Sequence, residues 1–415
     1  MTEIRRRGGQ GLRPVDHPAD RHGDGFAGPP PRVTFADELE RLPFAELLAV
    51  AERASPARVD AALHTNPLER TLEDFAALLS PAAAARLEDL AQASRALTIA
   101  RFGRTMRMYA PLYLSNECLT TCAYCGFARE LPIARKTLSP DETVHEARYL
   151  LRQGFRSILL LTGEHERLTG VEFLEERLRL LARETPQLSL EVQVWSEGEY
   201  RRLAEAGCEG VVIYQETYHP DTYARVHLAG RKRHFRWRLL GPERAARAGM
   251  RRVGVGALFG LHDDWRYEAL AVAAHAQFLM RHYWRSQVSV SVPRLRPSAA
   301  GYEPRTILSD AQLAQLVCAL RLFLPDAGLV LSAREAPALR DGLFRIGITH
   351  ASAGSHTEPG GYENPEGATG QFEVADLRSP AQVSARLREL GYDPVWEDWA
   401  RVTPSAESML SRTQR

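Results

Sequence analysis

Eight short apolar runs alternate with amphipathic segments along most of the chain, and this alternation restricts the fold more than any other feature of the sequence. An apolar run followed by a helix-like segment is the repeating unit of a parallel sheet. Eight such units predict an α/β fold, a TIM-type (βα)8 parallel barrel, although a doubly wound open sheet would show the same alternation. The strand candidates are residues 109–115, 157–162, 188–195, 210–216, 252–259, 287–293, 329–333 and 344–351.

The segment between the first two runs carries clear helix signals. Ser139 can cap a helix whose first residue is Pro140, and Glu142 completes a capping box. Gly154 is a helix-ending residue. The sequence therefore predicts a helix over residues 139–153.

Segments of different character flank the predicted barrel, which spans residues 105–355. Apolar residues at helical spacing predict an N-terminal helical extension over residues 33–104, which we expect to cover the N-terminal end of the barrel. Residues 356–415 are expected to form a C-terminal extension that packs on the barrel as a cap. Residues 1–32 mix Gly, Pro and charged residues without periodicity, and this composition predicts a disordered tail.

Charge and hydropathy exclude several classes of partner. Lys and Arg number 53 against 52 Asp and Glu, so no global field draws the chain to nucleic acid or to anionic lipid. No apolar run approaches the roughly 20 residues that span a bilayer, and the N-terminus lacks the apolar core of a secretory signal. We therefore expect a cytoplasmic protein whose partners are small molecules or other proteins.

Three of the five cysteines crowd into eight residues just after the first predicted strand. Cys118, Cys122 and Cys125 can converge on one iron-sulfur cluster, because thiolates are the ligands of such clusters. A four-iron cubane held by three cysteines keeps one iron open, and that iron can chelate an amine and a carboxylate, as the methionine end of S-adenosylmethionine would offer.

Zinc is the main alternative for this cysteine group. Structural zinc sites have four closed ligands, and His145, the candidate downstream, falls on a predicted helix without a partner at the usual spacing. The other two cysteines, Cys208 before a predicted strand and Cys318 on an apolar helix face, are interpreted as structural.

The pattern Cys-x-x-x-Cys-x-aromatic-Cys resembles the signature of the radical S-adenosylmethionine superfamily. The aromatic residue is Tyr124, which by this resemblance lies against the adenine. A Gly-Glu pair at the end of the second strand, Gly163 and Glu164, matches the element that binds the methionine amine in that superfamily. The resemblance implies one 4Fe-4S cluster on three cysteines and bound S-adenosyl-L-methionine.

A longer resemblance points to the 2-iminoacetate synthase family, the tyrosine lyases of thiamine thiazole synthesis. It implies cleavage of the Cα–Cβ bond of L-tyrosine to 2-iminoacetate, also called dehydroglycine, and p-cresol. One departure from the family pattern is Thr120, where Asn is common, and it affects only hydrogen bonding around the cluster. The matching stretches are residues 112–127, 162–166, 214–219, 256–258, 291–297, 332–335, 359–362 and 394–399.

Five polar residues near predicted strand ends are the candidates for holding the substrate. Arg334 is the first choice for the tyrosine carboxylate, because a guanidinium offers a planar fork, and Ser332 is expected to assist it. Arg296 also ends a strand and is a candidate to line the site. Glu216 and Tyr218 follow the fourth strand, where they would face the adenosine ribose or the substrate phenol, or else serve as polar residues at a helix start.

The resemblance also implies protein partners, and it leaves alternative functions open. We expect a thiazole synthase partner and a reductant of the flavodoxin or ferredoxin type. A related tyrosine lyase of hydrogenase maturation carries a second cluster on C-terminal cysteines, whereas this chain has no cysteine after Cys318. A tryptophan lyase and a noncatalytic iron-sulfur scaffold subunit of a thiazole synthase complex remain the alternatives.

A glycine-rich stretch in the fifth strand candidate looks similar to a dinucleotide-binding fingerprint but does not match it. Gly254, Gly256 and Gly260 have a spacing one residue too long, and the stretch lies within the strand. We interpret these small residues as places where a ligand approaches the backbone of the barrel.

Overall fold

The computed structural model describes residues 33–365 and 367–397. The tail predicted for residues 1–32 and the end of the C-terminal extension, residues 398–415, lie outside the described residues. Within the described ranges, no helix is both long enough and apolar enough to cross a membrane.

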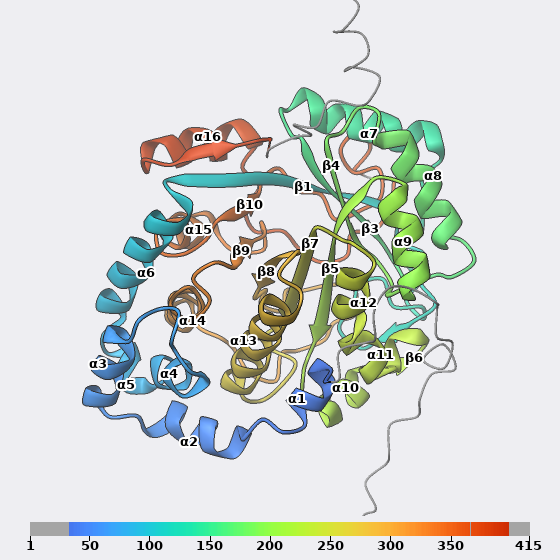
Figure 1. Cartoon of the computed structure of the whole chain (residues 1–415). Helices are drawn as coiled ribbons and strands as arrows, with labels where there is room; N and C mark the ends of the chain where they lie inside the picture. Colours follow the sequence, from blue (N-terminus) through green and yellow to red (C-terminus); the bar gives the residue numbers. More distant parts are fainter. Residues whose placement is uncertain (1–32, 366, 398–415) are drawn as a thin grey trace, which may run out of the picture.

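Eight parallel strands close into a barrel, as the alternation predicts (Figure 1). The order around the barrel is β1, β3, β4, β5, β7, β8, β9 and β10, and β10 pairs with β1 through His350 and Arg107. This closing pair rules out the doubly wound open sheet. The strands are β1 Thr105–Ser115, β3 Ser157–Thr162, β4 Gln187–Glu191, β5 Cys208–Glu216, β7 Arg252–Ala257, β8 Gln287–Ser291, β9 Gly328–Leu331 and β10 His350–Ser352.

The last strand is shorter than the apolar run 344–351 predicts. Phe344 is the final residue of a helix, and the strand begins only at His350. A buried helix end and a buried strand look alike in a short apolar run, so periodicity alone could not separate them.

Helices surround the barrel and connect its strands. Ser139 caps α7 with a hydroxyl that accepts from the Glu142 backbone N–H at 3.2 Å, and Gly154 adopts a φ of 100° after the helix, as predicted. The helices outside the barrel are α7 Pro140–Arg152, α8 Val171–Leu181, α9 Glu197–Glu205, α12 Gly241–Arg247, α13 Trp265–His282, α14 Asp310–Phe323 and α15 Pro337–Phe344.

An insertion between β5 and β7 covers the cysteine loop. It comprises α10 Pro220–Val226, β6 His227–Ala229, the 3-10 helix η2 Arg231–Arg233 and α11 Phe235–Leu239. Strand β6 pairs antiparallel with β2 Thr121–Cys122, inside the cysteine loop. This two-stranded sheet has no periodic signal in the sequence, and it brings residues 227–239 to the cysteines.

The N-terminal extension is helical, and its main contacts are with helices outside the barrel. The guanidinium of Arg70 donates to the Leu322 carbonyl at 2.6 Å, and the amide of Gln315 donates to the Leu78 carbonyl at 3.0 Å. The extension therefore packs on the outer helices α13 and α14, whose apolar residues run around most of their surfaces and need a second cover. Its helices are α1 Phe35–Leu39, α2 Phe44–Arg53, α3 Pro56–His64, α4 Leu72–Leu78, α5 Pro81–Ala84 and α6 Leu87–Phe102.

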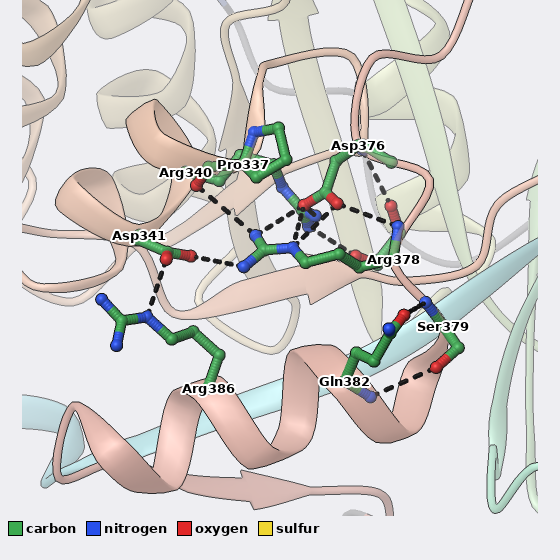
Figure 2. A network of polar contacts seen from close by, with 10 residues as sticks. Pro337, Arg340, Asp341, Asp376, Arg378, Ser379, Gln382 and Arg386 are labelled. Atoms are coloured by element: carbon green, nitrogen blue, oxygen red, sulfur yellow. Dashed lines mark hydrogen bonds and ion pairs between the residues drawn. The ribbon is translucent and has the colours of Figure 1, made fainter.

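The C-terminal extension is fixed to the barrel by a buried ionic network (Figure 2). Asp376 pairs with Arg340 of α15, and neither side chain is exposed. Arg378 donates to Asp376 at 2.7 Å and to Asp341 at 2.9 Å. Beyond this network, α16 Pro380–Glu389 leads to β11 Asp393–Val395, which pairs in parallel with the start of β1.

Candidate active site

The cysteine loop lies at the carboxyl ends of β1 and β3, where the last residues of the barrel strands come together. The Gly163 N–H donates to the Ser115 carbonyl at 3.0 Å, and the Leu119 N–H donates to the Glu164 carbonyl at 2.8 Å. A Cβ on Gly163 would lie 2.3 Å from the carbonyl oxygen of Glu117, so this close approach requires glycine. The Gly-Glu pair and the cysteines therefore form one unit.

The three thiols are shielded from solvent and held close together. Cys118 and Cys122 are buried, and Cys125 is partly buried. The Thr120 hydroxyl lies 3.0 Å from the sulfur of Cys118 and 3.6 Å from that of Cys122, so those two sulfurs are no farther apart than the sum of these distances. Thr120 thus contacts two of the three thiols.

The donor set fits a multi-iron cluster better than a single ion. Among the described residues, no three His, Cys, Asp or Glu side chains form a group that could hold one metal ion. A zinc site would need such a group, whereas each thiolate of a cubane binds a different iron and the sulfurs stand farther apart. Burial raises the pKa of Cys122 and Cys125, and the ammonium of Lys232 offsets only part of this rise. The number and position of the thiols therefore fit the cluster.

A buried charge network lies against this unit. Arg238 donates to Glu164 at 3.0 Å and to the Tyr214 carbonyl at 2.6 Å. Lys232 donates to Glu216 at 2.7 Å, and Arg238 stands 3.8 Å from the same carboxylate. Burial raises the pKa of Glu216, but the two cations outweigh this effect and hold its pKa below the ordinary value. Glu216 is therefore charged, and ion pairs fix both carboxylates in place.

Glu216 also has an unusual backbone. Its φ of 70° makes it the one non-glycine residue with positive φ among the described residues. This conformation is uncommon for a side chain of this size, and such strain concentrates at functional sites. The strained residue is the last of β5, at the same end of the barrel as the cysteine unit.

Tyr124 sits beside the thiols in a defined hydrogen-bonding state. Burial, Lys232 and Arg238 hold the pKa of His227 well below its ordinary value, so the imidazole is neutral. Its Nδ1 lies 3.0 Å from the Tyr223 carbonyl and must carry the proton there, which leaves Nε2 to accept from the Tyr124 hydroxyl at 2.9 Å. This bond fixes the Tyr124 ring, which can then serve as a flat surface for an adenine.

Next to this unit, the barrel interior holds a small cavity of ≈ 50 Å³ with both polar and apolar walls. Arg334 and Ser332 line it together with Glu191, and the Arg334 guanidinium lies 3.4 Å from the centre of the Phe372 ring. Burial first, and then the nearby Glu216, raise the pKa of Glu191 to about 7. The cavity therefore pairs a fixed cation with a carboxyl group that exchanges a proton near neutrality.

A chain of side chains joins the cavity to the cysteines. Tyr113 lines the cavity and donates to the Gln371 side chain at 2.8 Å. The amide of Gln371 donates to the sulfur of Cys125 at 3.7 Å. Two side chains, Tyr113 and Gln371, would thus connect a molecule in the cavity to Cys125.

The remaining two sequence candidates differ in their surroundings. Tyr218 is directed away from the site: its hydroxyl lies 2.9 Å from His275 Nδ1, and its ring packs edge-on against Phe35 of the N-terminal extension. The prediction that it faces the ribose or the phenol is therefore corrected, because its buried hydroxyl is hydrogen-bonded to His275. Arg296 is partly buried, and its Nε has no hydrogen-bond partner among the described residues.

Sequence reasoning missed several polar residues of the site. Glu191 had a signal, since it ends a strand at an inward position of the alternation Gln-Leu-Ser-Leu-Glu. Lys232 and Arg238 had none, because they come from the insertion whose pairing with the cysteine loop is not periodic. Gln371 comes from the C-terminal extension and reaches the site only through tertiary packing.

Two family models match residues that together span most of the barrel. Residues 112–272 match the model of the Radical SAM superfamily, and residues 291–393 match the Biotin and Thiamin Synthesis associated domain. Members of the first superfamily use an iron-sulfur cluster with S-adenosylmethionine, so this match implies both cofactors.

Individual relatives agree with these matches. The chain is similar to the 2-iminoacetate synthase of Escherichia coli K12, with 44% identity over 88% of this chain and 97% of the relative, and to that of Salmonella typhimurium LT2, with 42% identity over the same shares. Among solved structures it resembles HydG, a maturase of the [FeFe]-hydrogenase, with a TM-score of 0.83 and 29% identity over 91% of this chain and 84% of that one. From these matches, and from the cysteine unit at the barrel's carboxyl end, it follows that the chain belongs to the 2-iminoacetate synthase family of the radical SAM superfamily.

Proposed function

We propose that this protein cleaves the Cα–Cβ bond of L-tyrosine, giving 2-iminoacetate and p-cresol, with the first product destined for the thiazole of thiamine. The observation that carries the proposal is the cavity in which Arg334 and Glu191 lie together, two side chains from the cysteine unit. A cation and a proton acceptor in one cavity are the complement of an amino acid's carboxylate and amine. Family membership supports the same substrate.

Cys118, Cys122 and Cys125 would hold the 4Fe-4S cluster, and Gly163 with Glu164 would bind the methionine amine of S-adenosylmethionine. When bound, this pair of cofactors supplies a 5'-deoxyadenosyl radical that removes a hydrogen atom from the substrate. The protein's part is to orient both partners and to keep water away from them.

Two further residues complete the proposed cofactor site. Tyr124 would lie against the adenine, because it belongs to the cysteine loop and its ring is fixed by the bond to His227. Glu216, held by Lys232 and Arg238, would accept from the ribose hydroxyls. A charged, fixed carboxylate is a strong acceptor for such donors.

In the substrate cavity, Arg334 would clamp the tyrosine carboxylate with Ser332 as a second donor. The Phe372 ring under the guanidinium restricts its motion, so the fork is set before the substrate arrives. Glu191 would accept a proton from the substrate ammonium, since hydrogen abstraction at nitrogen requires the neutral amine. Arg296, with its unpartnered Nε, is a further donor to the bound molecules.

The decisive experiment is an anaerobic incubation with reductant and S-adenosylmethionine, with tyrosine, with tryptophan and with no amino acid. We expect p-cresol, 5'-deoxyadenosine and glyoxylate, the hydrolysis product of 2-iminoacetate, from tyrosine alone. An indole-derived product from tryptophan would establish a tryptophan lyase. Release of no 5'-deoxyadenosine would establish a noncatalytic scaffold, and cyanide would indicate chemistry like that of hydrogenase maturation.

A second experiment tests the cluster ligands. Changing Cys122 to Ala should abolish cluster formation on anaerobic reconstitution, measured as bound iron and sulfide. Cys208→Ala is the matched control, because that buried thiol donates to the Gly210 carbonyl at 3.2 Å, away from the cysteine loop. Full iron content in the Cys122 variant would overturn the ligand assignment.

Two partners belong to the proposal. A thiazole synthase would take up 2-iminoacetate before water destroys it, and a flavodoxin or ferredoxin would supply electrons to the cluster. Co-purification and reduction assays with each candidate, read as p-cresol formed without chemical reductant, would identify the electron donor.

A further inference from the structure

The two ends of the cysteine loop are buried although the loop is neither helix nor sheet over most of its length. Asn116 stands two residues before Cys118, and Phe127 stands two residues after Cys125. Both are almost completely buried, as is the neighbouring Ala128. A buried backbone carbonyl needs a hydrogen-bond donor, because leaving it unpaired is costly. For these three residues the donor is a side chain.

Arg135 donates to both ends of the loop. Its Nη1 donates to the Asn116 carbonyl at 2.7 Å and to the Phe127 carbonyl at 3.2 Å. Its Nη2 donates to the Ala128 carbonyl at 2.7 Å. Two longer contacts, both 3.5 Å, also go to backbone carbonyls just after the cysteines. One guanidinium thus joins the chain before the cysteines to the chain after them.

Asn116 in turn holds the segment that carries Arg135. Its side-chain amide donates to the Ala134 carbonyl at 2.9 Å, and its side-chain oxygen accepts from the Lys136 N–H at 2.7 Å. These two residues are the neighbours of Arg135 in the chain. The backbone on either side of Arg135 is therefore fixed, and its guanidinium meets the loop in a set geometry.

The residues that Arg135 holds are bonded directly to the last cysteine. The Phe127 N–H donates to the sulfur of Cys125 at 3.4 Å, and the Ala128 N–H donates to the Cys125 carbonyl at 3.0 Å. A shift of this part of the backbone would move Cys125 relative to the other two thiols. The position of the third sulfur therefore depends on the guanidinium.

We propose that Arg135 is a positioning residue that closes the cysteine loop and so holds the three thiols together for the cluster. The inference deepens the proposed function and rests on its assignment of the cluster ligands. Arginine suits this task because its planar fork presents several donors in fixed directions, whereas a lysine ammonium is a single point of charge.

Iron retention tests the proposal without turnover. Reconstituted protein, with no tyrosine present, is incubated anaerobically with an excess of an iron chelator, well below the melting temperature of each variant. We expect Arg135→Gln to lose iron roughly ten- to a hundredfold faster than the wild type, the usual effect of losing hydrogen bonds from a charged donor. Arg135→Lys should recover only part of this loss, because it keeps the charge without the fork.

A second arginine of the same loop provides the control. Arg129→Gln removes the same charge, but the Arg129 side chain is exposed, so this variant should lose iron at the wild-type rate. A wild-type rate in folded Arg135→Gln would overturn the proposal. Equal acceleration in the two Gln variants would also overturn it, because the effect would then come from charge and not from closure of the loop.

The apoprotein allows a test that needs no cluster. Alkylation with iodoacetamide, followed by peptide mass spectrometry, measures how accessible each cysteine is. In Arg135→Gln we expect Cys118 and Cys122, which are buried in the wild type, to react at least about tenfold faster. Cys208, buried away from the loop, should keep its rate. Unchanged rates at the loop would overturn the role of Arg135, whereas faster alkylation in a protein whose wild type binds no iron would overturn only the cluster assignment.

Discussion

The guanidinium of Arg238 lies 3.0 Å from the carboxylate of Glu164, and both side chains are almost completely buried. Glu164 follows β3, whereas Arg238 belongs to the insertion between β5 and β7. Because Glu164 is joined by its backbone to Leu119 of the cysteine loop, the pair ties the insertion to the proposed cofactor site. Arg238 therefore acts as a positioning residue for Glu164.

Replacing Arg238 with Gln should weaken S-adenosylmethionine binding at least tenfold while the cluster still forms. Removal of one partner of a buried ion pair leaves the other charge uncompensated, at a typical cost of about 3 to 5 kcal/mol. The Glu164 side chain would then lose its fixed orientation. Equilibrium binding of S-adenosylmethionine to protein of known iron content measures the effect.

A neighbour in the same helix provides the control. Arg236 pairs with Asp37 and Glu40 at the surface, with its side chain 32% exposed, so Arg236→Gln should bind S-adenosylmethionine as the wild type does. Equal affinities in the two variants would show that Arg238 does not position Glu164.

Arg334→Ala should raise the tyrosine concentration needed for turnover, with S-adenosylmethionine binding unchanged. A hydrogen bond to a charged group contributes about 1.5 to 3 kcal/mol, so tyrosine affinity should fall roughly ten- to a hundredfold. Arg345→Gln, at the exposed end of α15, is the control. If the Arg334 variant loses S-adenosylmethionine instead of tyrosine, Arg334 belongs to the cofactor site.

The parts of this protein that the sequence predicts are those encoded by short-range patterns. Seven of the eight strand candidates overlap their strands closely, because an apolar run with flanking turns is a local signal, and the cysteine loop is legible from spacing alone. The Tyr218 assignment failed because position after a strand does not determine which way a side chain points. Lys232, Arg238 and Gln371 come from segments whose place is set by tertiary packing. Their roles became visible only in three dimensions.

Asp376→Asn should destabilise the protein by about 3 to 5 kcal/mol at pH 7, because it leaves Arg340 buried without a counter-charge. Burial raises the pKa of Asp376, but Arg378 and Arg340 hold it below 3.8. Its contribution is therefore present above the unfolded pKa and is lost as pH falls through the folded value, so the difference between wild type and variant should shrink below about pH 4. Urea denaturation at several pH values measures it.

Arg386→Gln is the control for this network. Arg386 pairs with Asp341 at the surface, with its side chain 42% exposed, and should change stability little. An Asp376 variant as stable as the Arg386 variant would show that the buried network contributes nothing to stability.

Glu191 should give the reaction a pH dependence centred near neutrality. Its pKa is raised from 4.5 to about 7, chiefly by burial, so the carboxylate that accepts a proton from the substrate ammonium is formed as pH rises through 7. The rate of p-cresol formation in a single turnover should therefore increase between pH 6 and pH 8. Glu191→Gln should lower this rate by roughly a hundred- to ten-thousandfold, the usual range for loss of a general base, and remove the dependence.

Stability provides an independent check on the same residue. Because the folded pKa of Glu191 is above its unfolded value, its contribution to stability is present below pH 4.5 and is lost as pH rises to about 7. Glu191→Gln should thus lose less stability than the wild type over this interval, whatever its activity. Glu209→Gln is the matched control, since that glutamate stands in β5 and pairs with Arg251 at the surface. A Glu191 variant that keeps the wild-type pH–rate profile would exclude this residue as the proton acceptor. The stability measurement would then show separately whether the pKa of Glu191 is raised in the folded protein.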